Sequence, residues 1–235
     1  MTQGNDTHRK LYVGTLDGVC AVSSSNGGRS WEQGPVTPLD SAAARLSVST
    51  TQPGRAYLAA YEAGVFRTDD GGGSWRHLPS YPTAYAHSVL AHPAESETLF
   101  VGSEPAAVFR SNDGGDSWEE CQGFQEVSES EQWTFHGDRL SHVRELRTVP
   151  GDPDVMYAGI EVGGVVRTCD GGKNWKQLEG TNDDIHFLNI SEANPNRVYL
   201  ATAKAPYRSD DGGDNWELIN GGLERRYTLH IAASP

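Results

Sequence analysis

The chain has 235 residues, enough for one domain with a sizeable core, and a formal net charge of −13 at pH 7. Such acidity repels phosphate groups, so it argues against nucleic acids and anionic membranes as partners, while a basic protein partner would be favoured. The chain has three cysteines without CxxC spacing, expected to be free thiols, and no apolar stretch of membrane-spanning length.

Residues 1–10 are polar and lack the pattern of a signal peptide, so we expect a short N-terminal tail and a cytoplasmic protein. The remaining residues, 11–235, contain many glycines and short apolar runs but few helical periods. They are therefore expected to form a single all-β domain.

An eight-residue motif recurs five times in this domain, with the template Ser/Thr-x-Asp-x-Gly-x-Ser/Asn-Trp. Carboxylate or amide oxygens accept backbone hydrogen bonds within a turn, glycine supplies positive φ, and tryptophan anchors the turn. Each copy lies between two β-like runs and therefore predicts a hairpin. Asn26 replaces the aspartate in the first copy and is expected to cap its turn in the same way. The copies are residues 24–31, 68–75, 111–118, 168–175 and 209–216.

This motif resembles the Asp-box, or BNR repeat, of sialidases and related β-propellers. Its tryptophans recur at about 40–45 residues, apart from one longer interval after Trp118, and such a period fits a four-stranded propeller blade. The resemblance thus implies a β-propeller of five blades. The acidic boxes lack the distal bidentate carboxylate of a calcium loop, so we interpret them as structural turns.

The strands of each blade are named A to D from the centre outward, and each box joins strand C to strand D. The first repeat has no strand A, whereas residues 227–234 follow the last box as an isolated strand A. Two arrangements are open: this segment closes the ring beside residues 11–14, or the chain is part of a larger propeller. Strand B is expected at 11–14, 56–59, 99–102, 156–159 and 198–201, and strand A at 45–49, 87–91, 144–148 and 186–190.

Propeller geometry places the B–C and D–A loops on the face opposite the boxes, where ligands usually bind over the central channel. The B–C loops carry Asp17, Glu62, Glu104 and Glu161, with Lys204 in the fifth. Near the start of strand A the expected register places Arg45, His87, Arg144 and His186, with His142 on the same face and His230 about one residue off register. Each residue also has a structural interpretation, because such carboxylates pair with arginines of neighbouring blades and such histidines bond backbone carbonyls.

The longer interval between boxes adds the loop 125–141 to the same face. Loops of this length are usually functional or disordered, and this one contains Trp133, Phe135, His136, Asp138 and Arg139. Trp133 is a candidate for stacking on a sugar ring, although the loop could equally pack over the mouth of the channel.

The preferred hypothesis is a sialidase-like or glycosyl hydrolase-related protein that acts on or binds a glycan or small acidic ligand. Glu161, Glu104 and Glu62 are candidate acids, bases or nucleophiles, and Arg45, His87, Trp133, His142, Arg144 and His186 are candidate ligand-binding residues. No Arg-Ile-Pro segment of the sialidase kind is present, and no Tyr/Glu nucleophile pair can be assigned.

Two alternatives remain. The first is a non-catalytic binding or assembly scaffold. The second is a metal protein whose ligands are His87, His142, His186 and His230. The preferred hypothesis itself requires no cofactor and no metal.

Overall fold

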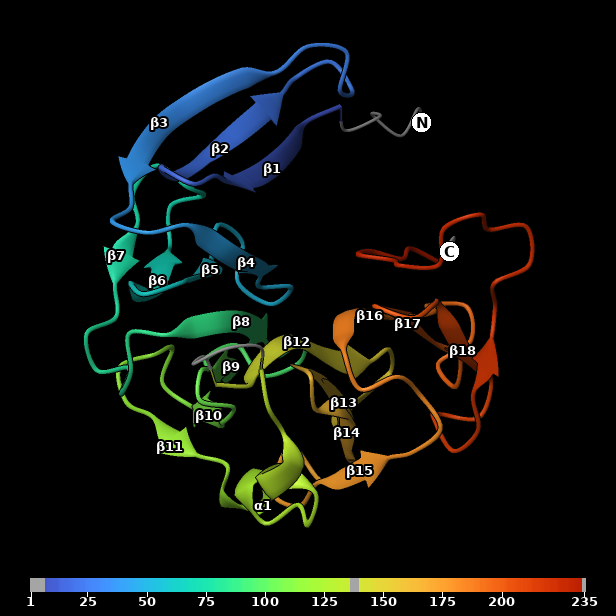
Figure 1. Cartoon of the computed structure of the whole chain (residues 1–235). Helices are drawn as coiled ribbons and strands as arrows, with labels where there is room; N and C mark the ends of the chain where they lie inside the picture. Colours follow the sequence, from blue (N-terminus) through green and yellow to red (C-terminus); the bar gives the residue numbers. More distant parts are fainter. Residues whose placement is uncertain (1–6, 136–139, 234–235) are drawn as a thin grey trace.

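The computed structural model describes residues 7–135 and 140–233 and consists almost entirely of antiparallel β-sheet. Five sheets follow one another around an arc, as expected for propeller blades (Figure 1). In each of the last four sheets, four strands are paired in sequence order from the centre outward. This arrangement confirms the predicted β-propeller of four-stranded blades.

Blade 1 differs from the others in having three strands, with β1 at its edge. Its strand β1 begins two residues earlier than expected, so residues 9 and 10 belong to the sheet and not to the polar tail. The strands are β1 (Arg9–Gly14), β2 (Gly18–Ser24) and β3 (Glu32–Pro38).

Blades 2 and 3 contain strands A to D close to the predicted positions. Blade 2 comprises β4 (Ala43–Val48), β5 (Ala56–Ala60), β6 (Gly64–Thr68) and β7 (Arg76–His77). Blade 3 comprises β8 (Ala86–Ala91), β9 (Leu99–Ser103), β10 (Val108–Ser111) and β11 (Glu119–Glu120).

The long interval after blade 3 forms a short helix, α1 (Gln122–Gln125), and a 3-10 turn, η1 (Ser130–Gln132). Blade 4 then comprises β12 (His142–Val149), β13 (Asp152–Glu161), β14 (Gly164–Thr168) and β15 (Lys176–Leu178). Blade 5 comprises β16 (Ile185–Ile190), β17 (Val198–Thr202), β18 (Tyr207–Ser209) and β19 (Glu217–Leu218).

The five motif turns share one hydrogen-bond pattern. In blade 2, Thr68 Oγ1 accepts from the Gly72 amide at 2.9 Å, and Asp70 Oδ1 accepts from the Ser74 amide at 3.0 Å. Asn26 performs the role of the aspartate in blade 1, because its Oδ1 accepts from the Ser30 amide at 3.0 Å. The predicted turn chemistry, including capping by asparagine, is therefore present. No metal-ligand cluster in the described part of the chain includes a box residue.

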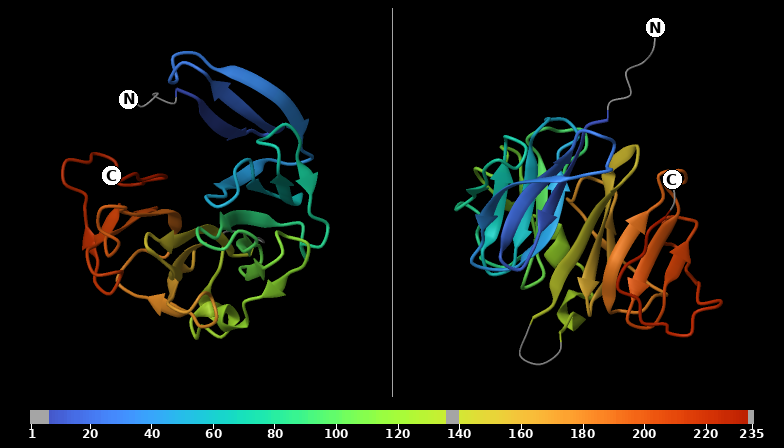
Figure 2. Two further views of the ribbon diagram at one scale, coloured as in Figure 1. Left: turned by 180° about the vertical axis from the view of Figure 1, so that it is seen from behind. Right: turned by 90° about the horizontal axis from the view of Figure 1, so that it is seen from above.

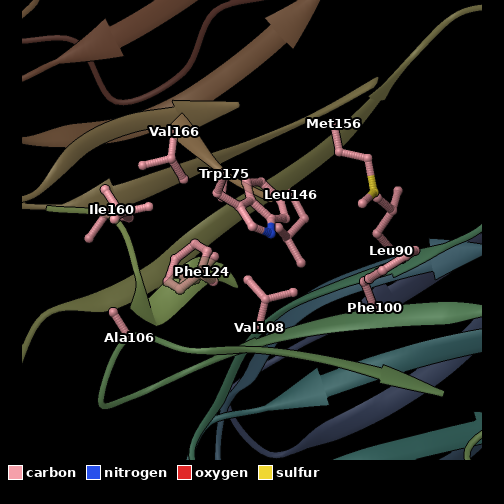
Figure 3. Close-up of a cluster of buried hydrophobic side chains, with 13 residues drawn as sticks. Leu90, Phe100, Ala106, Val108, Phe124, Leu146, Met156, Ile160, Val166 and Trp175 are labelled. Atoms are coloured by element: carbon pink, nitrogen blue, oxygen red, sulfur yellow. The ribbon is translucent and has the colours of Figure 1, made fainter. Parts of the chain in front are cut away.

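The apolar core lies between neighbouring blades. Phe124 of α1 is fully buried between blades 3 and 4, where it contacts the box tryptophan Trp175 at 5.4 Å between ring centroids (Figure 3). Gly123 permits this insertion, since a Cβ there would lie 2.0 Å from the carbonyl oxygen of Lys173. The interval between the third and fourth boxes thus packs into the propeller.

Of the two arrangements left open by the sequence, closure of the ring by residues 227–234 is not formed in the described part of this segment. Residues 227–233 form no strand, and β1 pairs with β2 alone. The segment lies on blade 5 instead, where the Thr228 amide donates to Thr202 O at 3.1 Å. The arc is consequently open between blade 1 and the C-terminal segment, in both face views (Figures 1 and 2).

The three cysteines are free, as predicted. Among the described residues, none of the helices is long and apolar enough to cross a membrane.

Candidate functional site

A β-bulge near the start of strand A sets which side chains reach the loop face. In each of blades 2 to 5 one residue is skipped in the pairing with strand B, and bulges commonly redirect side chains near functional sites. The skipped residues are Ala44, His87, Arg144 and His186. Three of the four positions predicted for this register are therefore equivalent.

Arg45 is the exception, because Ala44 occupies its predicted position in blade 2. Arg45 Nε lies 3.1 Å from Glu145 Oε2, and Arg147 Nη2 lies 3.0 Å from Glu145 Oε1. Both guanidiniums also lie over the ring of Phe187, at 5.9 and 5.4 Å from its centroid. Arg45 thus belongs to a separate group that joins strand A of blades 2, 4 and 5. Glu145, 2% exposed, is the centre of that group.

His87, His142, Glu104 and Glu161 form a continuous polar cluster across blades 3 and 4. The two imidazoles are stacked, with ring centroids 3.8 Å apart, and His87 Nε2 lies 3.1 Å from Glu104 Oε2. His142 Nε2 lies 2.8 Å from Glu161 Oε2, and its Nδ1 lies 3.6 Å from Glu104 Oε2. The structure therefore brings these four of the nine candidate site residues into one cluster, and Arg144 and His186 adjoin it through Glu161.

Glu161 is also paired with Arg144. Burial alone would raise the pKa of Glu161, but hydrogen bonds from His142 and the charge and hydrogen bond of Arg144 outweigh it and lower the pKa to about 2. Glu161 is consequently a carboxylate at neutral pH. It can accept hydrogen bonds or bind a cation, but it has no proton to donate as a general acid and its low pKa makes it a weak base.

Glu62 does not join this cluster. Glu161 ends strand β13 opposite His142, and the residue at the corresponding place in blade 2 is Tyr61, whose ring contacts His87 at 4.9 Å. Glu62 comes one residue later, with φ of 60°, and is exposed beside a different pocket. Glu62 therefore lies in the same loop position as Glu161 only to within one residue, and this shift removes it from the cluster.

Trp133 packs against the protein on one side and lines a pocket on the other. Its ring contacts Phe124 at 5.1 Å, and its Nε1 lies 3.4 Å from Gln177 Oε1. The pocket has a volume of about 550 Å³ and also contains Phe135, whose ring contacts His142 at 5.4 Å. Its lining residues are Pro105, Ala106, Gln125, Ser130, Glu131, Trp133, Thr134, Phe135, Leu140 and Ser141. The predicted residues His136, Asp138 and Arg139 lie outside the described residues.

His186 faces the boundary between blades 4 and 5. Its Nδ1 lies 2.7 Å from Thr228 O, and its Nε2 lies 3.2 Å from Asp184 Oδ1. His230 contacts Phe187 instead, at 5.1 Å between centroids. The alternative of one metal ion held by four histidines is not supported among the described residues, where the possible metal-ligand groups are His87, Glu104 and His142, and Glu161, Asp184 and His186.

Sequence reasoning missed Asp184, Glu145 and Arg147. Asp184 precedes strand A by one residue, and its counterparts in the other blades, Ala42, Tyr85 and His142, are not acidic, so comparison of the repeats carried no signal for a carboxylate there. Glu145 and Arg147 alternate along β12 with buried Leu146, and an alternation of charged and apolar residues in the innermost strand could have indicated a lining of the central channel.

No protein-family model and no curated protein sequence matches the chain. Several solved structures, however, are similar to it in fold. An ancestral GH74 enzyme has a TM-score of 0.69 at 20% identity over 92% of this chain and 30% of its own. The extracellular domain of a one component system from B. thetaiotaomicron has a TM-score of 0.70 at 15% identity over 96% of this chain and 29% of its own.

The GH74 xyloglucanase from Xanthomonas campestris has a TM-score of 0.52 at 16% identity over 92% of this chain and 44% of its own. The chain thus spans less than half the length of these three structures. Sequence identities this low indicate a shared fold but give no information about the chemistry of a site. On that basis the chain is a β-propeller with the architecture found in these proteins.

Proposed function

We propose that this propeller binds a neutral glycan on its loop face, in the pocket beside Trp133. The observation that carries the proposal is the composition of that pocket, which combines the rings of Trp133 and Phe135 with the polar side chains of Gln125, Glu131 and Thr134. A sugar ring has an apolar C–H face and a rim of hydroxyl groups. Aromatic rings complement the first, and amide, carboxylate and hydroxyl groups complement the second.

The arginines favour a neutral over an acidic sugar. Recognition of a sialic acid carboxylate would require guanidinium groups that are available to the ligand. Arg45 is bound to Glu145 and Arg144 to Glu161, and Glu131 adds negative charge to the pocket. An anionic ligand would therefore be repelled where a neutral one is not.

Binding is a better fit to the site than hydrolysis. Glycosidases of the usual kind place two carboxyl groups on either side of the scissile bond, one of them protonated. Glu104 and Glu161 are both largely buried and are each engaged with histidines, and Glu161 is ionised. Sialidase-like or other glycosidase activity is accordingly the alternative outcome of the test below.

The similar structures guide the choice of test ligands. The chain shares its fold with a xyloglucanase, so xyloglucan fragments are a rational first panel.

We also propose that the five motif turns are Asp-boxes of the BNR type, because each has the Ser/Thr, Asp/Asn and Gly hydrogen bonds that the motif requires.

The test is isothermal titration calorimetry with xyloglucan oligosaccharides, cellotetraose and sialyllactose, together with an assay for sugar release. We expect saturable binding of a neutral oligosaccharide, no binding of sialyllactose and no turnover. Phe135→Ala and Glu131→Gln should each weaken binding about tenfold or more, which corresponds to about 1.4 kcal/mol.

The matched control is Trp31→Ala, which removes a box tryptophan of blade 1 that is 40% exposed and does not line the pocket. It should bind as the unsubstituted protein does. If Phe135→Ala and Glu131→Gln both bind the oligosaccharide as the unsubstituted protein does, the pocket is not the binding site. Release of reducing sugar would establish the enzyme alternative.

A further inference from the structure

Three potential metal ligands meet at the boundary between blades 4 and 5. Glu161 ends β13, while Asp184 and His186 lie on either side of the first residue of β16. One ligand atom from each lies within 4.8 Å of the other two. Two carboxylate oxygens and one imidazole nitrogen form a donor set that suits divalent first-row metal ions.

His186 is held in an orientation that suits a ligand. Nδ1 lies 2.7 Å from Thr228 O, and a carbonyl oxygen only accepts, so Nδ1 carries the hydrogen. In the neutral imidazole, Nε2 then has the free lone pair. Metal-binding histidines commonly donate their other N–H to a backbone carbonyl in this way, which fixes both tautomer and ring orientation.

Asp184 provides an independent indication of a missing ligand. Its Oδ1 is buried and accepts no hydrogen bond from the described residues, although His186 Nε2 lies only 3.2 Å away. A lone pair facing a carboxylate oxygen at this distance is repulsive unless a proton or a cation lies between them. Two ligands bonded to one ion at about 2.1 Å would lie about 3.0–3.4 Å apart, which matches the observed separation.

Glu161 is supported by residues outside the group. His142 Nε2 lies 2.8 Å from Glu161 Oε2, and Arg144 pairs with the same carboxylate. Hydrogen bonds of this kind orient a ligating carboxylate. The positive charge of Arg144 opposes a cation, but the carboxylates of Glu161 and Asp184 exceed it by one negative charge when His186 is neutral.

We propose that Glu161, Asp184 and His186 bind a divalent transition-metal ion such as Zn²⁺ between blades 4 and 5. The ion would join the end of β13 to the start of β16. The competing explanation is a proton on His186 Nε2, which would make the residue an imidazolium paired with Asp184. The proposal is independent of glycan binding, because none of the three residues lines the Trp133 pocket.

The experiment uses the full chain after treatment with EDTA and removal of the chelator. Zn²⁺ is titrated by calorimetry, and the side-chain nitrogens of His186 are followed by ¹⁵N NMR. We expect one equivalent of Zn²⁺ to bind, with a shift of the His186 Nε2 resonance. Asp184→Asn should weaken binding at this site at least about tenfold, or about 1.4 kcal/mol.

Asp183→Asn is the matched control, since Asp183 is the exposed neighbour and its loss changes the net charge equally. It should bind Zn²⁺ as the unsubstituted protein does. Circular dichroism verifies that Asp184→Asn is folded, and Glu161→Gln replaces it if it is not. Failure of Zn²⁺ to shift the His186 resonance, or equal binding by the variant and the control, would overturn the proposal in favour of the imidazolium.

Discussion

His142 Nε2 lies 2.8 Å from Glu161 Oε2, and the two residues are directly opposite one another at the start of the β12–β13 ladder. Both side chains are largely buried, with exposures of 5% and 12%. This pair connects the stacked histidine cluster of blades 3 and 4 to the carboxylates at the boundary of blade 5. Loss of this pair should therefore lower the free energy of unfolding.

His142→Ala is expected to lower the free energy of unfolding by about 3 kcal/mol, because it leaves a buried carboxylate without one of its partners. His142→Gln should recover part of this loss, since an amide can donate to the same oxygen. Urea unfolding at pH 7 measures both. Equal stability of the alanine variant and the unsubstituted protein would show that Arg144 alone compensates the charge.

The boxes predict a specific loss of stability in acid. Hydrogen bonds from Ser117, Asn174 and Asn215, with further turn donors, lower the pKa of Asp113, Asp170 and Asp211 to about 2. The corresponding pKa in the unfolded chain is about 3.9. The stabilisation is thus complete above about pH 4 and is lost as the pH falls toward 2.

Urea titrations between pH 5 and 2 measure this loss. Asp170→Asn should be less stable than the unsubstituted protein at pH 5, and the difference should shrink toward pH 2. Asp152→Asn, at an exposed position outside the boxes, serves as the control. A difference that does not depend on pH would contradict the assignment of the lowered pKa to the turn hydrogen bonds.

Val162 has a backbone conformation that disfavours its side chain. Its φ is 57°, in the left-handed region, which costs a non-glycine residue about 1–2 kcal/mol. Val162→Gly should therefore raise the free energy of unfolding by up to about 1 kcal/mol, after the greater flexibility of glycine in the unfolded chain is subtracted. Val155→Gly, in β13, should be destabilising. A less stable Val162→Gly would show that packing of the valine outweighs its strain.

The edge of blade 1 predicts self-association. Strand β1 has one unpaired edge in the described chain, and it exposes Leu11 (52%) and Val13 (37%). Unprotected edges of this kind pair with other chains. We expect concentration-dependent association in analytical ultracentrifugation, reduced by Leu11→Lys. Leu223→Lys, at an exposed loop position, should leave it unchanged. A monomer at every concentration would contradict this expectation.

The strand order was predictable from the repeats because each box marks the turn between strands C and D. The site was predictable only to within a residue. A bulge inserts one residue into strand A, so Ala44 takes the position predicted for Arg45, and in the B–C turn Tyr61 rather than Glu62 corresponds to Glu161. The spacing of the motifs along the sequence predicts where each blade lies, but it does not reveal a one-residue shift within a blade.

The remaining features depend on contacts without a sequence pattern. Residues 227–233 resemble a strand, yet their contacts with blade 5, through Tyr227 and His186 at 4.7 Å and through Thr228, hold them away from β1. Asp184 becomes a potential ligand only because the bulge at His186 and the end of β13 bring three polar side chains together. Such convergence is a property of tertiary packing.

The most direct test of glycan binding follows the indole N–H of Trp133 by ¹H–¹⁵N NMR during titration with a xyloglucan oligosaccharide. The indole signals of the exposed Trp31 and of the other box tryptophans serve as internal references. The proposed site predicts a saturable shift of the Trp133 signal while that of Trp31 stays constant. A Trp133 signal that does not move at millimolar concentrations of every neutral oligosaccharide tested would contradict it.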